Sequence, residues 1–353
     1  MSIHITGCGS YIPKIVKKNK DFLEVNFLNP DGSEFNVSNE VIIKKFQSIT
    51  GIKERRYATN SESTSDLAFK AAKNAISDSG TNIESLDYII VAHNFGDIAH
   101  NNIQTDILPS IASRVKNKLR IKNPNCVCYD IIFGCPGWIE GVIQAKAFIS
   151  SGLAKKCLVI GAETLSRTYD SNDRDSMIYS DGAGATIVEE KKKNNGGILS
   201  HKSCTFSNDE AYYLFLGKSF DNKSNGNDKY MKMHGHKIYE FAISHVPKAL
   251  KDCLELSGKK INDVKKIFLH QANEKMDQAI VDRFYKLYDI KTPDHIMPMS
   301  IEKLGNSSVA TIPTLLDLVK KNKLENHKLR KGDLILFGSV GAGMNVNAIT
   351  YQI

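Results

Sequence analysis

The sequence contains no long hydrophobic run. Nowhere does it approach about 18 uninterrupted apolar residues, the length that a membrane-spanning helix needs. Its first residues, MSIHITGCGSYIP, have the pattern of a strand and a turn, and they lack the basic and then apolar segments of a secretion signal. We therefore expect a cytoplasmic protein with no membrane insertion.

Cysteine is sparse, and its seven positions give an odd number. An odd set of cysteines in mostly apolar contexts does not indicate a framework of disulfides. Cys126 and Cys128 lack a second pair at zinc-finger spacing, so no metal site is predicted. Each cysteine is therefore expected to be a small buried hydrophobic residue unless its surroundings favour chemistry.

Concentrated charge is also missing. The net charge is +8, but the basic residues are spread along the chain, and the only dense run covers residues 191–193. Without a recognised reading motif, this charge does not predict nucleic-acid binding. A diffuse positive surface suits an acidic protein partner or phosphate groups.

Strand-like apolar runs alternate with helical patterns. Residues 87–92, 157–160 and 185–188 have the β-branched, continuous apolar character of buried strands. Apolar residues between Leu67 and Ile76 fall on one face of a helix that Gly80 ends. The sequence therefore predicts an α/β fold.

An internal repeat divides the chain. Residues 133–164 run from a tight turn into a helix and then a strand, and residues 304–343 repeat that order. An apolar strand followed by a histidine precedes each copy, as IIVAHN and as IFLHQAN. We predict two duplicated halves, 1–190 and 191–353, joined at the polar, glycine-rich stretch 191–197. Cys135 and Asn306 occupy equivalent positions in the two copies.

Cys135 stands in the segment DIIFGCPGW, where an apolar strand ends and a glycine permits a sharp turn into a helix. Pro136 suits the first position of that helix. The positive end of the helix dipole would lower the pKa of a thiol there and favour the nucleophilic thiolate. The alternative is a buried structural cysteine.

Two further residues suit the same chemistry. His270 follows the strand IFL, and its imidazole could donate a hydrogen bond or accept a proton. Asn306, in LGNSS, could cap a helix, or its side-chain amide could stabilise an oxyanion. Neither residue is decisive alone.

The ordered combination of motifs resembles the 3-oxoacyl-(acyl-carrier-protein) synthase III family, whose members have the thiolase-like fold. The matching segments run nearly end to end: ITGCGSYIP at 5–13, TGIKERR at 50–56, GCPGW at 134–138, DR and DGAGA at 173–174 and 181–185, HQAN at 270–273 and GNSSVATIP at 305–313. The resemblance implies two duplicated βαβ-type halves in a layered α-β-α-β-α arrangement. It also implies a homodimer.

By this resemblance, Cys135 takes the acyl group of a thioester. A malonyl thioester on an acyl-carrier protein then loses carbon dioxide and attacks that acyl group in a Claisen condensation. His270 and Asn306 would stabilise the enolate, and the backbone amides of Cys135 and Ala342 would form a second oxyanion hole. Substrates would arrive on the phosphopantetheine of the carrier protein or of coenzyme A, with no other cofactor. Flanking glycines would let the thioester approach closely.

Related chemistries fit less well. A degradative thiolase needs a second cysteine in the C-terminal glycine loop, but none follows Cys253. Asn306 stands where an elongating synthase has its second histidine, and a papain-like hydrolase would not explain the duplicated halves. Two alternatives stay open. One is a specialised enzyme that joins an acyl group to a 3-oxoacyl thioester, as in dialkylresorcinol formation; the other is a non-catalytic partner subunit.

Binding residues follow the family pattern only in part. The tryptophan and arginine with which bacterial initiation enzymes grip the coenzyme A nucleotide are absent from residues 41–49. Arg174 remains as a phosphate or adenine contact, and Lys275 and Arg283 are candidates for carrier-protein docking. The loss of that grip favours carrier-protein thioesters at both steps. Candidate apolar residues of the acyl pocket are Phe95, Met177 and Met233.

Overall fold

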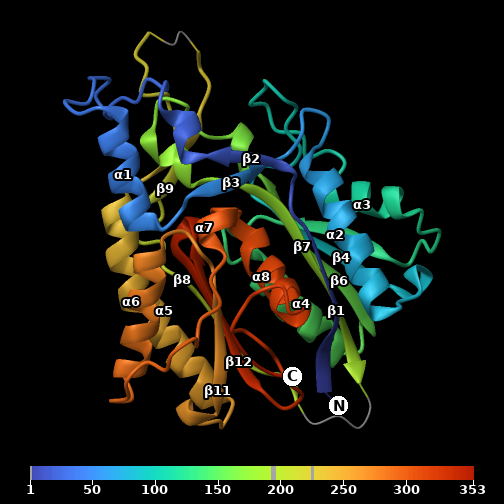
Figure 1. Ribbon diagram of the computed structural model, residues 1–353. Helices are drawn as coiled ribbons and strands as arrows, with labels where there is room; N and C mark the ends of the chain where they lie inside the picture. Colours follow the sequence, from blue (N-terminus) through green and yellow to red (C-terminus); the bar gives the residue numbers. More distant parts are fainter. Residues whose placement is uncertain (1, 192–195, 224–225) are drawn as a thin grey trace.

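Two β-sheets, whose strand orders correspond over four strands, form the framework of the protein in its computed structural model, which describes residues 2–191, 196–223 and 226–353 (Figure 1). The first sheet has the order β1-β7-β6-β4-β5, and the second has the order β8-β13-β12-β11. In both sheets the first two pairings are antiparallel and the third is parallel. This shared topology is the duplication that the sequence repeat predicts.

The strands of the first sheet are β1 (Ser2–Tyr11), β4 (Tyr88–Ala92), β5 (Val127–Ile131), β6 (Lys156–Thr164) and β7 (Asp181–Lys191). Those of the second are β8 (Gly197–Thr205), β11 (Val264–Leu269), β12 (Leu334–Gly341) and β13 (Asn345–Gln352). Two small ribbons pair β2 (Ile15–Lys18) with β3 (Glu54–Tyr57), and β9 (Leu214–Gly217) with β10 (Tyr230–Met233).

Helices cover both sheets and fill the space between them, which gives the predicted five-layered α-β-α-β-α arrangement (Figure 1). The central layer holds α4 (Gly137–Ser150) and α8 (Thr311–Lys320). The outer layers hold α2 (Thr64–Ser79) with α3 (Ile111–Leu119), and α5 (Gly235–Leu256) with α6 (Glu274–Lys286). Two more helices, α1 (Asn39–Thr50) and α7 (Ile301–Leu304), lie beside the second sheet's upper end. None of the helices in the described ranges has the length and apolar character to span a bilayer.

The main core lies between the two sheets. Trp138 of α4 packs edge-on against Phe337 of β12 with ring centroids 5.7 Å apart, and Phe337 also contacts Phe268 of β11. Nearly all of β6 is buried because helices cover both of its faces, as its continuous apolar run predicts. Elements of both halves therefore build one shared core.

The chain passes from the first sheet to the second between Lys191, the last residue of β7, and Gly197, the first of β8. The predicted seam falls here, and residues 192–195 within it lie outside the described residues. The boundary between residues 190 and 191 stays a prediction. The contact of α8 with β1 and β7 shows that the halves are packed against each other, rather than separated by a linker.

Local signals fix the helix ends. In α2, the N-cap residue Ser63 and the carboxylate of Asp66 form a capping box, with the backbone N–H of Ser63 donating to Asp66 Oδ2 at 3.0 Å. Gly80 ends the helix with φ of +66°, a conformation that glycine adopts at little cost. The end of the helix at Gly80 is the one that the sequence predicts.

Candidate active site

A sharp turn between β5 and α4 carries Cys135. Gly134 adopts a φ of +66°, and a Cβ atom there would lie 2.5 Å from the backbone nitrogen of Ala342. Pro136 is the N-cap of α4, one position before the expected one. The thiol is thus held at the start of a buried helix, and Cys135 as a whole residue is partly exposed.

His270 and Asn306 come from two different loops of the second half. His270 follows β11, and its backbone N–H donates to Gly338 of β12 at 3.0 Å. Asn306 lies between α7 and α8, five residues before α8 begins, and its backbone carbonyl accepts from the N–H of Ser180 at 2.8 Å. Both side chains are more than nine-tenths buried.

The amide of Asn306 has a defined orientation. Its Oδ1 atom accepts a hydrogen bond from the backbone N–H of Ser308 at 2.7 Å. The oxygen is therefore used within the loop, as in a helix cap, and the Nδ2 group has no acceptor within residues 2–191, 196–223 and 226–353. The capping role and the oxyanion role expected from the sequence are compatible in one residue.

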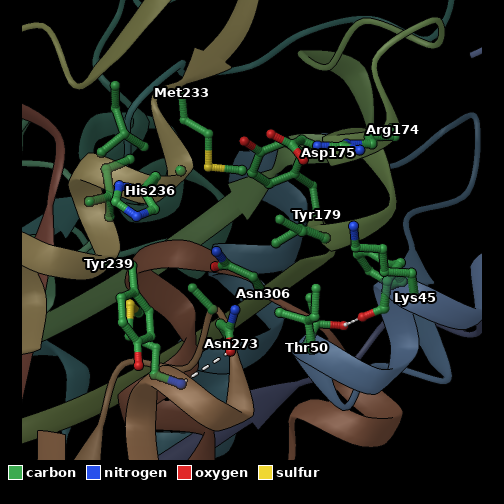
Figure 2. A pocket seen from close by; sticks show the side chains of 18 of the residues that line it. Lys45, Thr50, Arg174, Asp175, Tyr179, Met233, His236, Tyr239, Asn273 and Asn306 are labelled. Carbon is green, nitrogen blue, oxygen red and sulfur yellow. Dashed lines mark hydrogen bonds between the residues drawn. The ribbon is translucent and has the colours of Figure 1, made fainter. Parts of the chain in front are cut away.

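One cavity of about 670 Å³ brings the three predicted residues together, with Cys135, His270 and Asn306 all on its wall. Helix α1, the segment 174–179 and the start of α5 form other walls, as Figure 2 shows. Most of the lining is apolar, including Phe46, Ile178 and Leu214. A largely dry cavity strengthens hydrogen bonds to any charge that develops inside it.

Burial sets the protonation states of Cys135 and His270. It raises the pKa of the Cys135 thiol to about 11, an effect that Ser308 opposes by a hydrogen bond. The helix N-terminus alone had predicted a lowered pKa; the surrounding protein desolvates the thiolate and reverses that expectation. Burial also lowers the pKa of His270 to about 4. At neutral pH the site therefore holds a thiol and a neutral imidazole.

A buried polar network behind Cys135 was not found from the sequence. Ser308 Oγ donates to Cys135 Sγ at 3.4 Å, and it accepts from Asn94 Nδ2 at 3.1 Å. The same amide of Asn94 also donates to the carboxylate of Glu163 at the end of β6. The only sequence signal was a charged residue that ends an otherwise apolar strand.

Glu163 should make stability depend on pH. Burial raises its pKa to about 8, so between its unfolded value of about 4.5 and 8 the folded protein binds the extra proton. Stability therefore falls as pH rises through this window, by on the order of 4 kcal/mol. Denaturant unfolding should therefore give a larger free energy of unfolding at pH 5 than at pH 8, and Glu163→Gln should remove most of this difference. The exposed Glu325→Gln should leave it unchanged, and an unaltered difference in Glu163→Gln would contradict the assignment.

The glycine loop after β12 packs directly on the nucleophile turn. A Cβ atom on Gly341 would lie 2.3 Å from the backbone nitrogen of Cys135. Asn345 Nδ2 also donates to the carbonyl of Ala342 at 2.9 Å and to that of Phe133 at 3.4 Å, which ties the two loops together. Glycine at position 341 is thus required by loop packing, in addition to any approach of a thioester.

Gly341→Ala should displace Cys135 and lower stability by about 1–3 kcal/mol, because the added methyl group overpacks the turn. Denaturant unfolding and the rate of Cys135 alkylation would measure both effects. Gly182→Ala is the matched control, since a Cβ on this buried strand glycine would meet nothing closer than 3.5 Å. Equal behaviour of the two variants would show that the loops can separate without cost.

The predicted binding residues do not gather at one place. Arg174 lines the cavity, with its guanidinium 5.3 Å from the centre of the Phe35 ring. Lys275 and Arg283 are exposed on α6 and are not part of the cavity wall, and Arg283 donates to the carbonyl of Ile243 at 3.2 Å. A docking role for these two would use the outer surface.

Of the three apolar pocket candidates, only Met233 lines the cavity. Phe95 and Met177 were wrong choices as cavity-lining residues. Met177 is fully buried in a small cluster with Phe22 and Ile42 behind α1. Among the described residues, no group of three or more histidine, cysteine or acidic side chains could hold a metal ion.

Comparison with known proteins gives the family. A family model described as 3-oxoacyl-[acyl-carrier-protein (ACP)] synthase III matches residues 129–206, and the model of its C-terminal part matches residues 254–353. A β-ketoacyl-[acyl-carrier-protein] synthase III from Ehrlichia ruminantium (strain Welgevonden) is 32% identical over 344 residues, which cover 97% of each chain. The chain belongs to the 3-oxoacyl-[acyl-carrier-protein] synthase III family.

Other members of the synthase III family agree with this assignment. The Porphyra purpurea protein is 32% identical over 360 residues, covering 100% of this chain and 99% of its own. The crystal structure of the synthase III from Thermus thermophilus is 29% identical, covers 99% of both chains and superposes with a TM-score of 0.80. The predicted family, the thiolase-like fold and the class of condensing acyltransferase are confirmed.

Proposed function

We propose that the protein catalyses a decarboxylative Claisen condensation, with Cys135 as the acyl carrier and His270 and Asn306 as the donors that stabilise the enolate. The observation that supports this most directly is the convergence of these three side chains on one largely apolar cavity. Cys135 lies more than 130 residues before the other two in the sequence, so the fold is needed to assemble the three.

Acylation begins with attack of the Cys135 sulfur on a thioester carbonyl. The new C–S bond forms as the bond to the carrier sulfur breaks, and the proton of the Cys135 thiol leaves with the released carrier thiol. Backbone N–H groups of Cys135 and Ala342 would hold the oxyanion of this step. The raised pKa of Cys135 means that only a small fraction of the thiol is ionised at neutral pH, and the attacking thiolate comes from that fraction.

Condensation uses the side-chain donors of His270 and Asn306. When a malonyl thioester loses carbon dioxide, the electron pair of the broken C–C bond becomes an enolate whose oxygen accepts hydrogen bonds from His270 and Asn306. A neutral imidazole N–H and the free Nδ2 of Asn306 suit this role, because both donate without first binding a proton. The enolate carbon then attacks the acyl group, and the Cys135 thiolate leaves.

The cavity mouth supports an acyl-carrier protein as the main carrier. Val37, Val41 and Ile49 on or beside α1 are 50%, 52% and 38% exposed, and they line the same cavity as the basic residues Lys45 and Arg174. Exposed apolar side chains next to basic ones suit the surface of a docked acidic protein.

Homodimer formation has its own structural support. β5 is an edge strand of the first sheet and pairs only with β4 in the part of the chain that the structure describes. Large apolar side chains near this edge are exposed, with Val127 at 47%, Ile132 at 65% and Leu108 at 88%. An open apolar edge of this kind favours pairing with a second copy. Light scattering in solution would test it.

The function is tested by intact-protein mass spectrometry with acyl thioesters of several chain lengths on coenzyme A and on acyl-carrier protein. We expect the mass of one acyl group to be added and then lost when a malonyl-carrier thioester follows, with a 3-oxoacyl product formed. Consumption of a 3-oxoacyl thioester in place of malonyl would indicate the specialised condensation. No adduct with any donor would favour the non-catalytic partner subunit.

A further inference from the structure

Two polar side chains on the cavity wall have no hydrogen-bond partner among the residues that the structure describes. Tyr179 is only 4% exposed, and its hydroxyl oxygen makes no hydrogen bond within the described residues. The carboxylate of Asp175 has no hydrogen-bond or ion-pair partner there either. Figure 2 shows Tyr179 extending toward Asp175 and Met233 on one wall of the cavity.

Nearby cations do not neutralise Asp175 directly. Lys232 is buried, and its Nζ atom is held by Asp170 at 2.7 Å and Asp173 at 3.1 Å. The Arg174 guanidinium lies over the Phe35 ring. Burial and the neighbouring Asp173 raise the pKa of Asp175 to about 6. Asp175 is therefore mostly ionised at neutral pH, with its acceptor atoms facing the cavity.

An unpaired buried hydroxyl and an unpaired carboxylate both destabilise a folded protein. Native proteins rarely keep such groups without a reason, and both of these lie in a binding cavity. The wall around them is otherwise apolar, with Ile178, Leu214 and Met233. A bound ligand that carries hydrogen-bonding groups would supply the missing partners.

A hydroxyl group meets the needs of both side chains. It can donate to the carboxylate of Asp175 and at the same time accept from the phenol of Tyr179. Tyr179 also forms a backbone bridge with Asn306, and Cys135 lines the same cavity. The pair is thus close to the reacting groups, where the substrate chain lies, and not only at the mouth.

We propose that Asp175 and Tyr179 form a polar subsite that binds a hydroxyl group on the acyl chain of the thioester substrate. The subsite makes the enzyme prefer hydroxyacyl thioesters over unsubstituted ones, because a plain chain would leave both polar groups unpaired in a dry wall. This inference rests on the proposed function, since the thioester must reach Cys135.

The test measures acylation of Cys135 by intact-mass kinetics. The donors are the N-acetylcysteamine thioesters of hexanoic, 3-hydroxyhexanoic and 6-hydroxyhexanoic acids. We expect kcat/KM for at least one hydroxylated donor to exceed that of the hexanoyl donor by about 10-fold or more. Tyr179→Phe and Asp175→Asn should each remove this preference, by lowering the rate with the hydroxylated donor and raising the rate with the hexanoyl donor, whose plain chain no longer leaves that group unpaired.

Two controls separate binding from a structural role. Tyr212→Phe removes a hydroxyl from a tyrosine that is 79% exposed, and it should keep the preference. At pH 8 both variants should unfold at the wild-type temperature or at a higher temperature, because Tyr179→Phe removes an unpaired hydroxyl and Asp175→Asn removes an unpaired charge. A residue retained for structure would lower the unfolding temperature when replaced.

Three results would overturn the subsite. If the hexanoyl donor acylates Cys135 as fast as both hydroxylated donors, the subsite is wrong and the proposed condensation stands. A second result would be that both variants slow acylation equally with every coenzyme A thioester and do not slow it with any N-acetylcysteamine thioester. In that case Asp175 and Tyr179 bind the pantetheine arm instead. If no donor acylates Cys135, the proposed function fails, and the subsite fails with it.

Discussion

Cys135→Ala will abolish acylation of the protein by every thioester donor, and the condensation rate will fall by roughly 10⁴-fold or more. Alanine removes the only sulfur that the turn between β5 and α4 presents to the cavity. Intact-protein mass spectrometry measures the adduct, and product formation from a malonyl thioester measures the turnover. Cys204→Ala is the matched control, because Cys204 is a partly exposed thiol on β8 outside the cavity.

The pH dependence of acylation carries further information on Cys135. Since burial raises the pKa of its thiol to about 11, the acylation rate should still be rising at pH 9. A rate that levels off below pH 8 would show that the helix N-terminus dominates over burial. An adduct that survives in Cys135→Ala would place the nucleophile elsewhere.

His270→Ala and Asn306→Ala will each lower the condensation rate by about 10²–10³-fold and leave acylation of Cys135 within a few-fold of the wild-type rate. Both side chains are donors to the enolate oxygen, which forms only after acylation. Single-turnover measurement of the acyl adduct, followed by carbon dioxide release from a malonyl thioester, separates the two steps. The double variant should lose less than the product of the single losses, because the two donors share one oxygen.

The control for this pair is His236→Ala, which removes an exposed imidazole from the cavity wall. Burial lowers the pKa of His270 to about 4, so its titration should not affect condensation above about pH 5. If His270→Ala slows acylation as strongly as condensation, the imidazole acts as the base for the thiol, and the assignment to the enolate is wrong.

Local sequence signals predicted the elements of this fold because they act over short distances. The continuous apolar run of β6 indicated a strand that helices cover on both faces, and the order of motifs gave the duplication. The end of α2 at Gly80 followed from the same kind of local rule. Its start at the capping box of Ser63 and Asp66 is shown by the hydrogen bond in the structure.

The sequence by itself determined the family, the layered α/β architecture and the three candidate catalytic residues, because each lies in a short motif with its own local signal. Only the tertiary structure decided the properties that depend on distant neighbours. The cavity walls reverse the expected pKa shift of Cys135, and the packing of Gly341 on the nucleophile turn joins two halves of the chain. Tyr179 and Asp175 look ordinary in sequence, since the lack of a partner is a property of three-dimensional surroundings that no local pattern records.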